Sequence, residues 1–201
     1  MTAETPIYLD HNATTPILPE VVDAMLPYLR EHFGNPSSGH VFGRRAHDAV
    51  ERARGQVATL LGCDDGEVVF TSGGTEANNL AIRGVVEARD DRRNVITTAI
   101  EHPATERPCA WLERHGMRVT RIGVDVDGRA RVEDARAAID AATALVTVMH
   151  SNNETGVLQP VVDFAVLAHA VGAILHTDAA QSAGKVPLKV RELGVDLLSV
   201  A

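Results

Sequence analysis

The chain has 201 residues, of which 45% are hydrophobic and 23% are charged. Chains of this size and composition form globular proteins with one sizeable core, and no apolar run approaches the ~18 residues that a membrane-spanning helix needs. The formal charge of −8 and the aromatic content of 3% disfavour a nucleic-acid surface, which needs clustered cations and stacking faces. We therefore predict a soluble protein with neither membrane nor nucleic-acid partners.

The cysteine and histidine patterns exclude two further classes. Cys63 and Cys109 are too few, and too far apart, for a disulfide framework or a zinc site. The nine histidines include no H-E-x-x-H motif, so we predict no metal. The first residues carry neither a basic leader before an apolar stretch nor an Arg-rich amphipathic segment, and we expect a cytoplasmic location.

The predicted elements change in character along the chain. A short extended stretch at 7–9 is followed by two helices with apolar residues at helical spacing, 19–33 and 42–61, the second ending at Gly62. From residue 67, short β-branched runs alternate with helical segments. The predicted strands are 68–71, 95–98, 119–122, 145–149 and 174–175, and the helices between them are 76–88, 103–115, 132–141 and 161–171.

This alternation predicts an α/β fold with a largely parallel sheet covered by helices on both faces. We expect residues 1–15 to form an N-terminal extended segment and residues 16–201 one large domain. Residues 195–201 are typical of another buried strand and have no cap or polar tail, so we expect this domain to be incomplete at its C-terminal end. Ligands of such sheets bind at the carboxyl ends of the strands.

The stretch FTSGGTEANN (70–79) passes from a strand through two glycines into a helix. Glycines let backbone N–H groups approach a ligand, and a helix N-terminus favours negative charge. An anion seat suited to phosphate is one interpretation. A well-capped helix after a tight turn is the alternative. The G-K-[ST] of a nucleotide-binding loop is absent.

In TTAIEHPAT (97–105), His102 stands between a strand and Pro103. Proline suits the first helical position and keeps the preceding residue extended, so the imidazole is fixed at a strand-to-helix junction. It can stack on a flat ligand or move a proton. The alternative is a histidine with a structural role only.

Two further strand ends carry polar side chains. In MHSNNETG (149–156), the amide of Asn153 could bind a carboxylate or a phenolic oxygen, although turn formation alone would explain the motif. In HTDAAQSAGK (176–185), Asp178 follows an apolar run, and a buried carboxylate needs a cationic partner. A protonated heteroaromatic nitrogen would serve, and an N-cap aspartate is the alternative.

An anion seat, an imidazole, an amide and a carboxylate at one sheet edge match the needs of pyridoxal 5′-phosphate. The helix N-terminus would take the phosphate, His102 would cover one ring face, and Asp178 would keep the pyridine nitrogen protonated.

The same stretches, with YLDHNATTP (8–16), FGNPSSGH (33–40) and MHSNNETGVLQP (149–160), resemble the cysteine desulfurases (NifS/IscS-like). This group belongs to the class V aminotransferases within the type I pyridoxal-phosphate fold. The resemblance runs in the same order along essentially the whole chain.

The resemblance implies roles for particular residues. Gly74 and Thr75 would bind the phosphate, His102 would stack on the ring, and Asp178 would pair with the pyridine nitrogen. Gln181 would bind the ring hydroxyl oxygen, and Asn153 would help bind the substrate carboxylate. The implied reaction converts L-cysteine to L-alanine and leaves a persulfide on an enzyme cysteine, for iron–sulfur cluster assembly or other sulfur transfer. A homodimer and a scaffold or sulfur-acceptor protein would be its partners.

The sequence also departs from this family. The Schiff-base lysine, the nucleophilic cysteine and the arginine that grips the substrate carboxylate have no counterpart in the 201 residues, and Ala201 stands where many members have a phosphate-binding serine. Lys185 is predicted to be a bystander. We therefore expect an N-terminal portion that is inactive alone. The alternatives are a selenocysteine lyase or other class V lyase or aminotransferase, and a non-catalytic piece such as a dimerisation scaffold or half of a split gene product.

Overall fold

The computed structural model describes residues 6–201. These divide into two compact units, the first up to Val57 and the second Ala58–Ala201. The division falls inside the long helix α2 (Val41–Leu61). The expected segment 1–15 and the expected domain 16–201 stay predictions.

The first unit holds α1 (Pro19–Arg30) and most of α2. Proline begins α1, as its fixed φ favours. A turn precedes α2, and a Cβ atom added at Gly43 would lie only 2.1 Å from the carbonyl oxygen of Ser38. Glycine is therefore required where this turn lies against the helix. Residues 7–9 form no strand.

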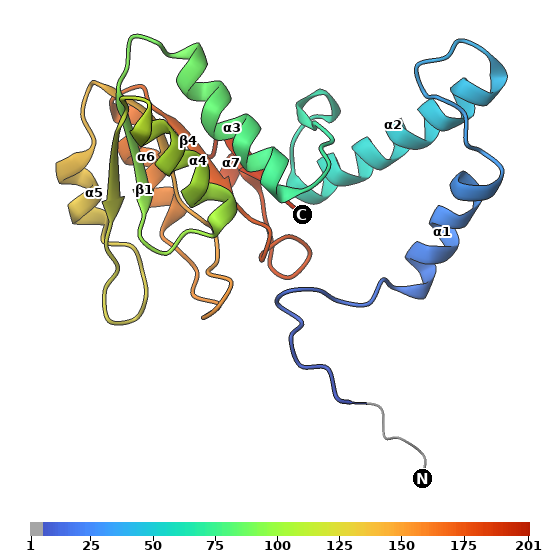
Figure 1. Ribbon diagram of the computed structural model, residues 1–201, viewed down its shortest axis with the longest axis horizontal. Helices are drawn as coiled ribbons and strands as arrows, with labels where there is room; N and C mark the ends of the chain where they lie inside the picture. The colour runs from blue at the N-terminus through green and yellow to red at the C-terminus, as the bar shows by residue number, and fades with distance from the viewer. Residues whose placement is uncertain (1–5) are drawn as a thin grey trace. The chain divides into compact units, whose positions relative to one another are not determined.

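The second unit contains a five-stranded sheet in the order β2-β1-β3-β4-β5, shown with its helices in Figure 1. All four strand pairs are parallel. The strands are β1 (Asn94–Thr98), β2 (Arg118–Ile122), β3 (Thr143–Thr147), β4 (Ile174–Asp178) and β5 (Leu197–Ser199). The predicted parallel α/β sheet is confirmed.

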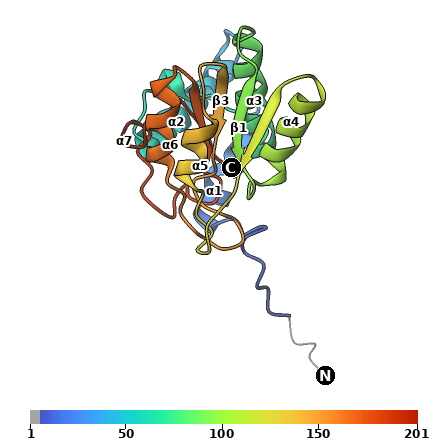
Figure 2. The same cartoon turned by 90° about the vertical axis from the view of Figure 1, so that its left-hand side faces the viewer.

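Helices cover both faces of this sheet, as Figure 2 shows. Alternate strand residues point to opposite faces, and the two buried clusters follow that rule. Val95 and Leu145 pack with Ile82 of α3 in one cluster, whereas Ile96 and Val146 pack on the other face. The first face carries α3 (Gly74–Ala88) and α4 (Pro103–Arg114), and the second carries α5 (Val132–Ala138) and α6 (Val161–Ala170).

The expected strand at 68–71 is wrong. The chain is extended at Val68, with φ −87° and ψ 124°, but residues 68–71 join no ladder in the described part of the chain. Val69 and Phe70 remain 68% and 49% exposed. A β-branched run favours an extended backbone, whereas a strand must also pair in a ladder with a neighbouring strand. Two short helices were not predicted, the 3-10 helix η1 (Asp65–Glu67) and α7 (Val190–Leu193).

The chain order of the strands places a switch point beside β1. From β1 the chain continues to β2 on one side, and it then crosses to β3 on the other side. Such a reversal opens a crevice at the carboxyl ends of β1 and β3. Open α/β sheets bind ligands in a crevice of this kind. The loops that follow β1 and β3 contain His102 and Asn153.

Candidate functional site

A pocket of about 190 Å³ opens at the carboxyl ends of β1, β3 and β4, beside the first turn of α3. Polar side chains from all four elements meet there. The lining includes every residue predicted from the sequence, namely Gly74, Thr75, His102, Asn153, Asp178 and Gln181. Residues separated by up to 107 positions in the chain are thus gathered at one edge of the sheet.

The glycine turn supplies one wall of the pocket. Gly73, the N-cap of α3, has φ 151° and ψ 179°, a conformation that is essentially restricted to glycine. Because Gly73 has no side chain, no side-chain cap covers the first N–H groups of α3. Those groups carry the positive end of the helix dipole. The alternative, a well-capped helix after a tight turn, also has support. The backbone N–H of Ser72 donates to Oε2 of Glu76 over 2.6 Å.

Asp178, the last residue of β4, is only 7% exposed. Its Oδ2 accepts a hydrogen bond from Nδ2 of Asn78 over 2.7 Å, and its Oδ1 accepts from the backbone N–H of Ala180 over 3.0 Å. The bond from Ala180 is of the local capping kind that the N-cap alternative for Asp178 predicts. Within residues 6–201, no Lys or Arg lines the pocket, so a positively charged ligand atom would find a carboxylate there that has no cationic partner in the lining.

Asn78 was not foreseen from the sequence. It lies one helical turn after Gly74 and one turn before Ile82, and both Asn78 and Ile82 are buried. Its Oδ1 is buried without a hydrogen-bond partner among the described residues. A polar residue on the apolar face of α3 was the available signal, and its partner Asp178 lies 100 residues away. An unpaired buried acceptor beside the pocket fits a ligand that donates a hydrogen bond.

His102 is held as the sequence predicted. It is the N-cap of α4 with φ −62° and ψ 149°, and Pro103 begins the helix. Its Nδ1 accepts a hydrogen bond from the backbone N–H of Ala104 over 3.1 Å. An accepting Nδ1 carries no proton, so the neutral ring holds its proton on Nε2. This capping bond gives His102 the structural role that was the alternative interpretation. The residue also lines the pocket.

The two adjacent asparagines have different roles. Asn152 is 8% exposed and forms the turn, because its Oδ1 accepts from the backbone N–H groups of Glu154 and Thr155. Asn153 lines the pocket, and its Nδ2 donates to Oε1 of Glu154 over 2.9 Å. The turn-forming interpretation therefore applies to Asn152 and leaves Asn153 at the pocket.

Lys185 contacts a pocket residue without lining the pocket. Its Nζ donates to Oε1 of Gln181 over 2.9 Å, four residues earlier in the chain. The amide nitrogen is the donor end of the Gln181 side chain. The second lysine, Lys189, lies against the carbonyl oxygens of Thr59 and Leu60 at 3.4 and 3.5 Å.

The comparison with protein families matches residues 7–201 to the aminotransferase class-V model. The chain belongs to the class-V aminotransferase family. It is 48% identical over 195 residues to cysteine desulfurase 2 of Trichormus variabilis, covering 97% of this chain and 49% of that protein. The chain thus spans about half the length of the curated relatives it matches.

Solved structures of this family share the fold. A NifS-like protein is 36% identical, with a TM-score of 0.90 over 94% of this chain and 53% of that one. The structure of SspA in complex with cysteine is also 36% identical, with a TM-score of 0.93 over 96% of this chain and 56% of that one. These matches confirm the resemblance to cysteine desulfurases and the fold class predicted from the sequence.

At the wall of the pocket of this class-V chain, a polar cluster that includes the lining residue Ser151 ties two loops together. The hydroxyl of Ser182 lies 2.6 Å from that of Ser151 and 2.7 Å from Nδ1 of His150. All three residues are buried, and burial lowers the pKa of His150. The cluster therefore fixes the turn after β4 against the loop after β3, and these two segments contain Gln181 and Asn153.

Neither cysteine is placed or activated to act as a nucleophile at the pocket. Burial raises the pKa of Cys109 to about 12, and burial followed by Glu67 raises the pKa of Cys63 above its ordinary value. Neither residue lines the pocket. A thiol with a raised pKa is a weak nucleophile at neutral pH.

No helix in residues 6–201 is long and apolar enough to cross a membrane. Over the same residues, no cluster of three or more His, Cys, Asp or Glu side chains could hold a metal ion.

Proposed function

We propose that this chain forms the pyridoxal 5′-phosphate site of a cysteine desulfurase, which converts L-cysteine to L-alanine and transfers the sulfur to an enzyme cysteine. Three findings support the proposal: the class-V family match, the 48% identity to a cysteine desulfurase, and the cysteine complex of a related structure. The observation that carries it is the meeting of six separately predicted residues around one pocket that contains the buried Asp178.

The residues at the pocket fit this cofactor. Gly74 and Thr75 would hold the phosphate with the N–H groups of the first turn of α3. The side chain of His102 would cover one face of the ring, and the amide of Gln181 would donate to the ring hydroxyl oxygen. Asn153 would contact the substrate carboxylate. The bound cofactor supplies an electron sink for the carbon next to the substrate amine.

Asp178 carries the electrostatic part of this proposal. A buried carboxylate stabilises a proton on a nearby heteroaromatic nitrogen. Loss of that proton would leave the carboxylate buried without a cationic partner, which costs several kcal/mol. Asn78 holds one carboxylate oxygen and Ala180 holds the other, so the group is already oriented. Binding therefore requires no rearrangement of Asp178.

We further propose that this chain alone binds the cofactor without turning over cysteine. Among the described residues, no lysine and no cysteine lines the pocket. Lys185 is hydrogen-bonded to the side chain of Gln181, and Lys189 lies against the carbonyl oxygen of Thr59. The sulfur-accepting cysteine, the covalent anchor, the homodimer, an iron–sulfur scaffold or other sulfur acceptor and the cytoplasmic location all belong to this proposal for the whole protein.

A cofactor titration tests the proposal. The fluorescence of the single tryptophan, Trp111 on α4, should be quenched when the cofactor binds. Asp178→Ala should weaken binding at least tenfold, since about 1.4 kcal/mol corresponds to a factor of ten. Asp163→Ala on α6 is a matched control and should bind normally. Inorganic phosphate should compete with the cofactor.

Four results would count against parts of the proposal. Binding of equal strength in the Asp178 variant would remove the role of the carboxylate. Absence of any saturable cofactor binding would favour a non-catalytic scaffold. Alanine release from L-cysteine at a steady rate by the 201-residue chain would contradict the expected inactivity, and preferential release from L-selenocysteine by a longer chain would favour a selenocysteine lyase.

A further inference from the structure

A buried acid joins the two loops that flank the pocket. Glu101 immediately precedes His102, and its Oε1 accepts hydrogen bonds from the hydroxyl of Thr98 over 2.6 Å and from the backbone N–H of Met149 over 2.9 Å. Thr98 ends β1, and Met149 lies two residues beyond the end of β3. The bond to Met149 therefore crosses between neighbouring strand ends.

This bond replaces backbone pairing where the sheet separates. The pairing between β1 and β3 ends at Ile96 and Val146. Beyond this pair, the segment that follows β1 leads toward α4 and no longer runs beside the segment that follows β3. The N–H of Met149 then lacks a backbone acceptor on the β1 side, and a buried N–H without a partner costs about 1–3 kcal/mol. The carboxyl of Glu101 supplies the acceptor. A second tie, from Nδ2 of Asn152 to the carbonyl oxygen of Ile100, joins the same loops over 3.3 Å.

The second carboxyl oxygen of Glu101, Oε2, is buried without a hydrogen-bond partner among the described residues. The charged groups that act on it are both negative, Asp178 on β4 and Glu106 on α4, and the latter is paired with Arg121. Burial raises the pKa of Glu101 to about 8; the hydrogen bonds from Thr98 and Met149 lower it, but burial outweighs them, and the two acidic neighbours add to the rise. At neutral pH the group is thus mostly a neutral acid, which suits a buried bridge.

Resting on the proposed function, we propose that Glu101 is a positioning residue: its carboxyl holds the His102 loop against the Met149–Asn153 loop, so that the imidazole and the amide of Asn153 face the same bound cofactor. Glu101 itself does not line the pocket. It acts through the residue next to it on one side and through Met149, four residues before Asn153, on the other. Ionisation strengthens the two hydrogen bonds to Oε1, but it leaves a buried charge near Asp178, and burial outweighs those bonds. The ionised form is therefore favoured when the loops separate and let water reach the carboxylate, which loosens the tie.

The tie can be tested without any cofactor. In the full chain, the NMR shift of the Met149 amide should follow a pH transition with a midpoint of about 8. Glu101→Gln keeps a carbonyl acceptor but cannot ionise, so the transition should vanish while the amide stays protected from exchange. Glu106→Gln removes a neighbouring negative charge together with its ion pair to Arg121, and the midpoint should move to lower pH without disappearing. A transition that persists in Glu101→Gln would overturn the assignment.

Cofactor binding tests the consequence for the site. Glu101→Gln should bind pyridoxal 5′-phosphate as the wild type does at pH 7. At pH 9, where about nine-tenths of Glu101 is ionised, wild-type affinity should be up to about tenfold weaker than that of Glu101→Gln. Comparing the two proteins at each pH cancels the titration of the cofactor itself. Thr98→Val removes the other hydrogen bond to Oε1 of Glu101. This variant should bind pyridoxal 5′-phosphate more weakly than the wild type does at pH 7.

The outcomes separate this inference from the proposed function. If no variant binds the cofactor but the Met149 transition behaves as described, the proposed function fails and the tie stands. If the wild type binds and its affinity relative to Glu101→Gln is constant from pH 7 to pH 9, the positioning role fails and the cofactor site stands. Equal binding by Glu101→Ala and the wild type would also overturn it.

Discussion

Replacing Glu101 by Gln should change how the stability of the chain depends on pH. The pKa of Glu101 is about 8 in the folded chain and 4.5 for an ordinary glutamate. Between these values the folded state holds a proton that the unfolded state has released. The free energy of unfolding therefore falls by about 1.4 kcal/mol for each pH unit of rise across this window, and it falls by up to about 5 kcal/mol in total.

A second buried group opposes this trend at lower pH. Burial lowers the pKa of His176 from 6.5 to about 4, where it bridges Thr147 and Ser199 over 2.8 and 2.9 Å. Between pH 4 and 6.5, His176 is protonated in the unfolded state and neutral in the folded state. This group therefore makes the free energy of unfolding rise with pH. The two contributions offset each other below pH 6.5, and the loss due to Glu101 should emerge above it.

Denaturant unfolding of both proteins from pH 5 to 8.5 measures this effect. Subtracting the free energies of wild type and Glu101→Gln at each pH removes His176 and every other unchanged group. The difference should move in favour of the variant by about 1.4 kcal/mol per pH unit up to pH 8 and then level off. Glu133→Gln, at an exposed site on α5, should show no such slope. A flat difference for Glu101→Gln would refute the reasoning that the acid is buried and protonated.

Two other predictions concern the glycine turn and the thiols. Gly73→Ala should destabilise the chain by about 1–3 kcal/mol, because φ 151° is unfavourable for alanine. In the same helix, Gly84→Ala has open space around the added Cβ and should stabilise by about 0.5–1 kcal/mol; equal effects in thermal unfolding would contradict the strained turn. A thiol reagent should modify Cys63 while Cys109, which is fully buried, stays unreacted in the folded chain; reaction of both at the same rate would show that the core opens there.

Much of the site could be predicted because polar residues end apolar runs in the sequence. Asp178 ends β4 and His102 follows β1, and parallel strands bring their carboxyl ends to one edge. Local sequence was sufficient for these positions. The helices α3 and α4 likewise begin within two residues of the predicted starts, since a glycine turn and a proline mark them.

The features that were missed depend on contacts between distant residues. Glu101 belongs to the TTAIEHPAT stretch, but its partner Met149 lies 48 residues further on. Asn78 becomes informative only when α3 is known to face Asp178. The strand expected at 68–71 failed for a related reason, because local composition indicates an extended chain and cannot supply a neighbouring strand.

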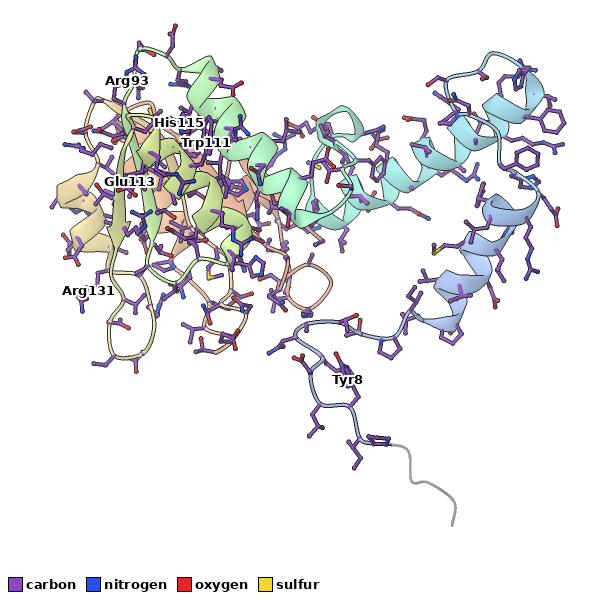
Figure 3. The ribbon with its side chains drawn as sticks, in the orientation of Figure 1. Tyr8, Arg93, Trp111, Glu113, His115 and Arg131 are labelled. Atoms are coloured by element: carbon purple, nitrogen blue, oxygen red, sulfur yellow. The ribbon has the colours of Figure 1, made fainter. Side chains whose placement is uncertain are left out.

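The surroundings of Trp111 provide a convenient probe of α4. Its ring stacks on His115, with centroids 3.8 Å apart, and the guanidinium of Arg83 lies 4.3 Å from its centroid; Figure 3 labels Trp111 and His115 on this helix. Because α4 begins directly after His102, a change in the tryptophan emission reports on the element that positions the imidazole. Its response to cofactor should therefore be unaffected by variants on α5 or α6.

The most direct test of the cofactor site is the protonation state of the pyridine nitrogen in the bound cofactor. Pyridoxal 5′-phosphate labelled with nitrogen-15 at the ring should show the protonated chemical shift at pH 8 when bound to the wild-type chain, and the unprotonated shift when bound to Asp178→Ala. An unprotonated nitrogen in the wild-type complex would contradict the account, because Asp178 would then lie beside the pocket without acting on the ring.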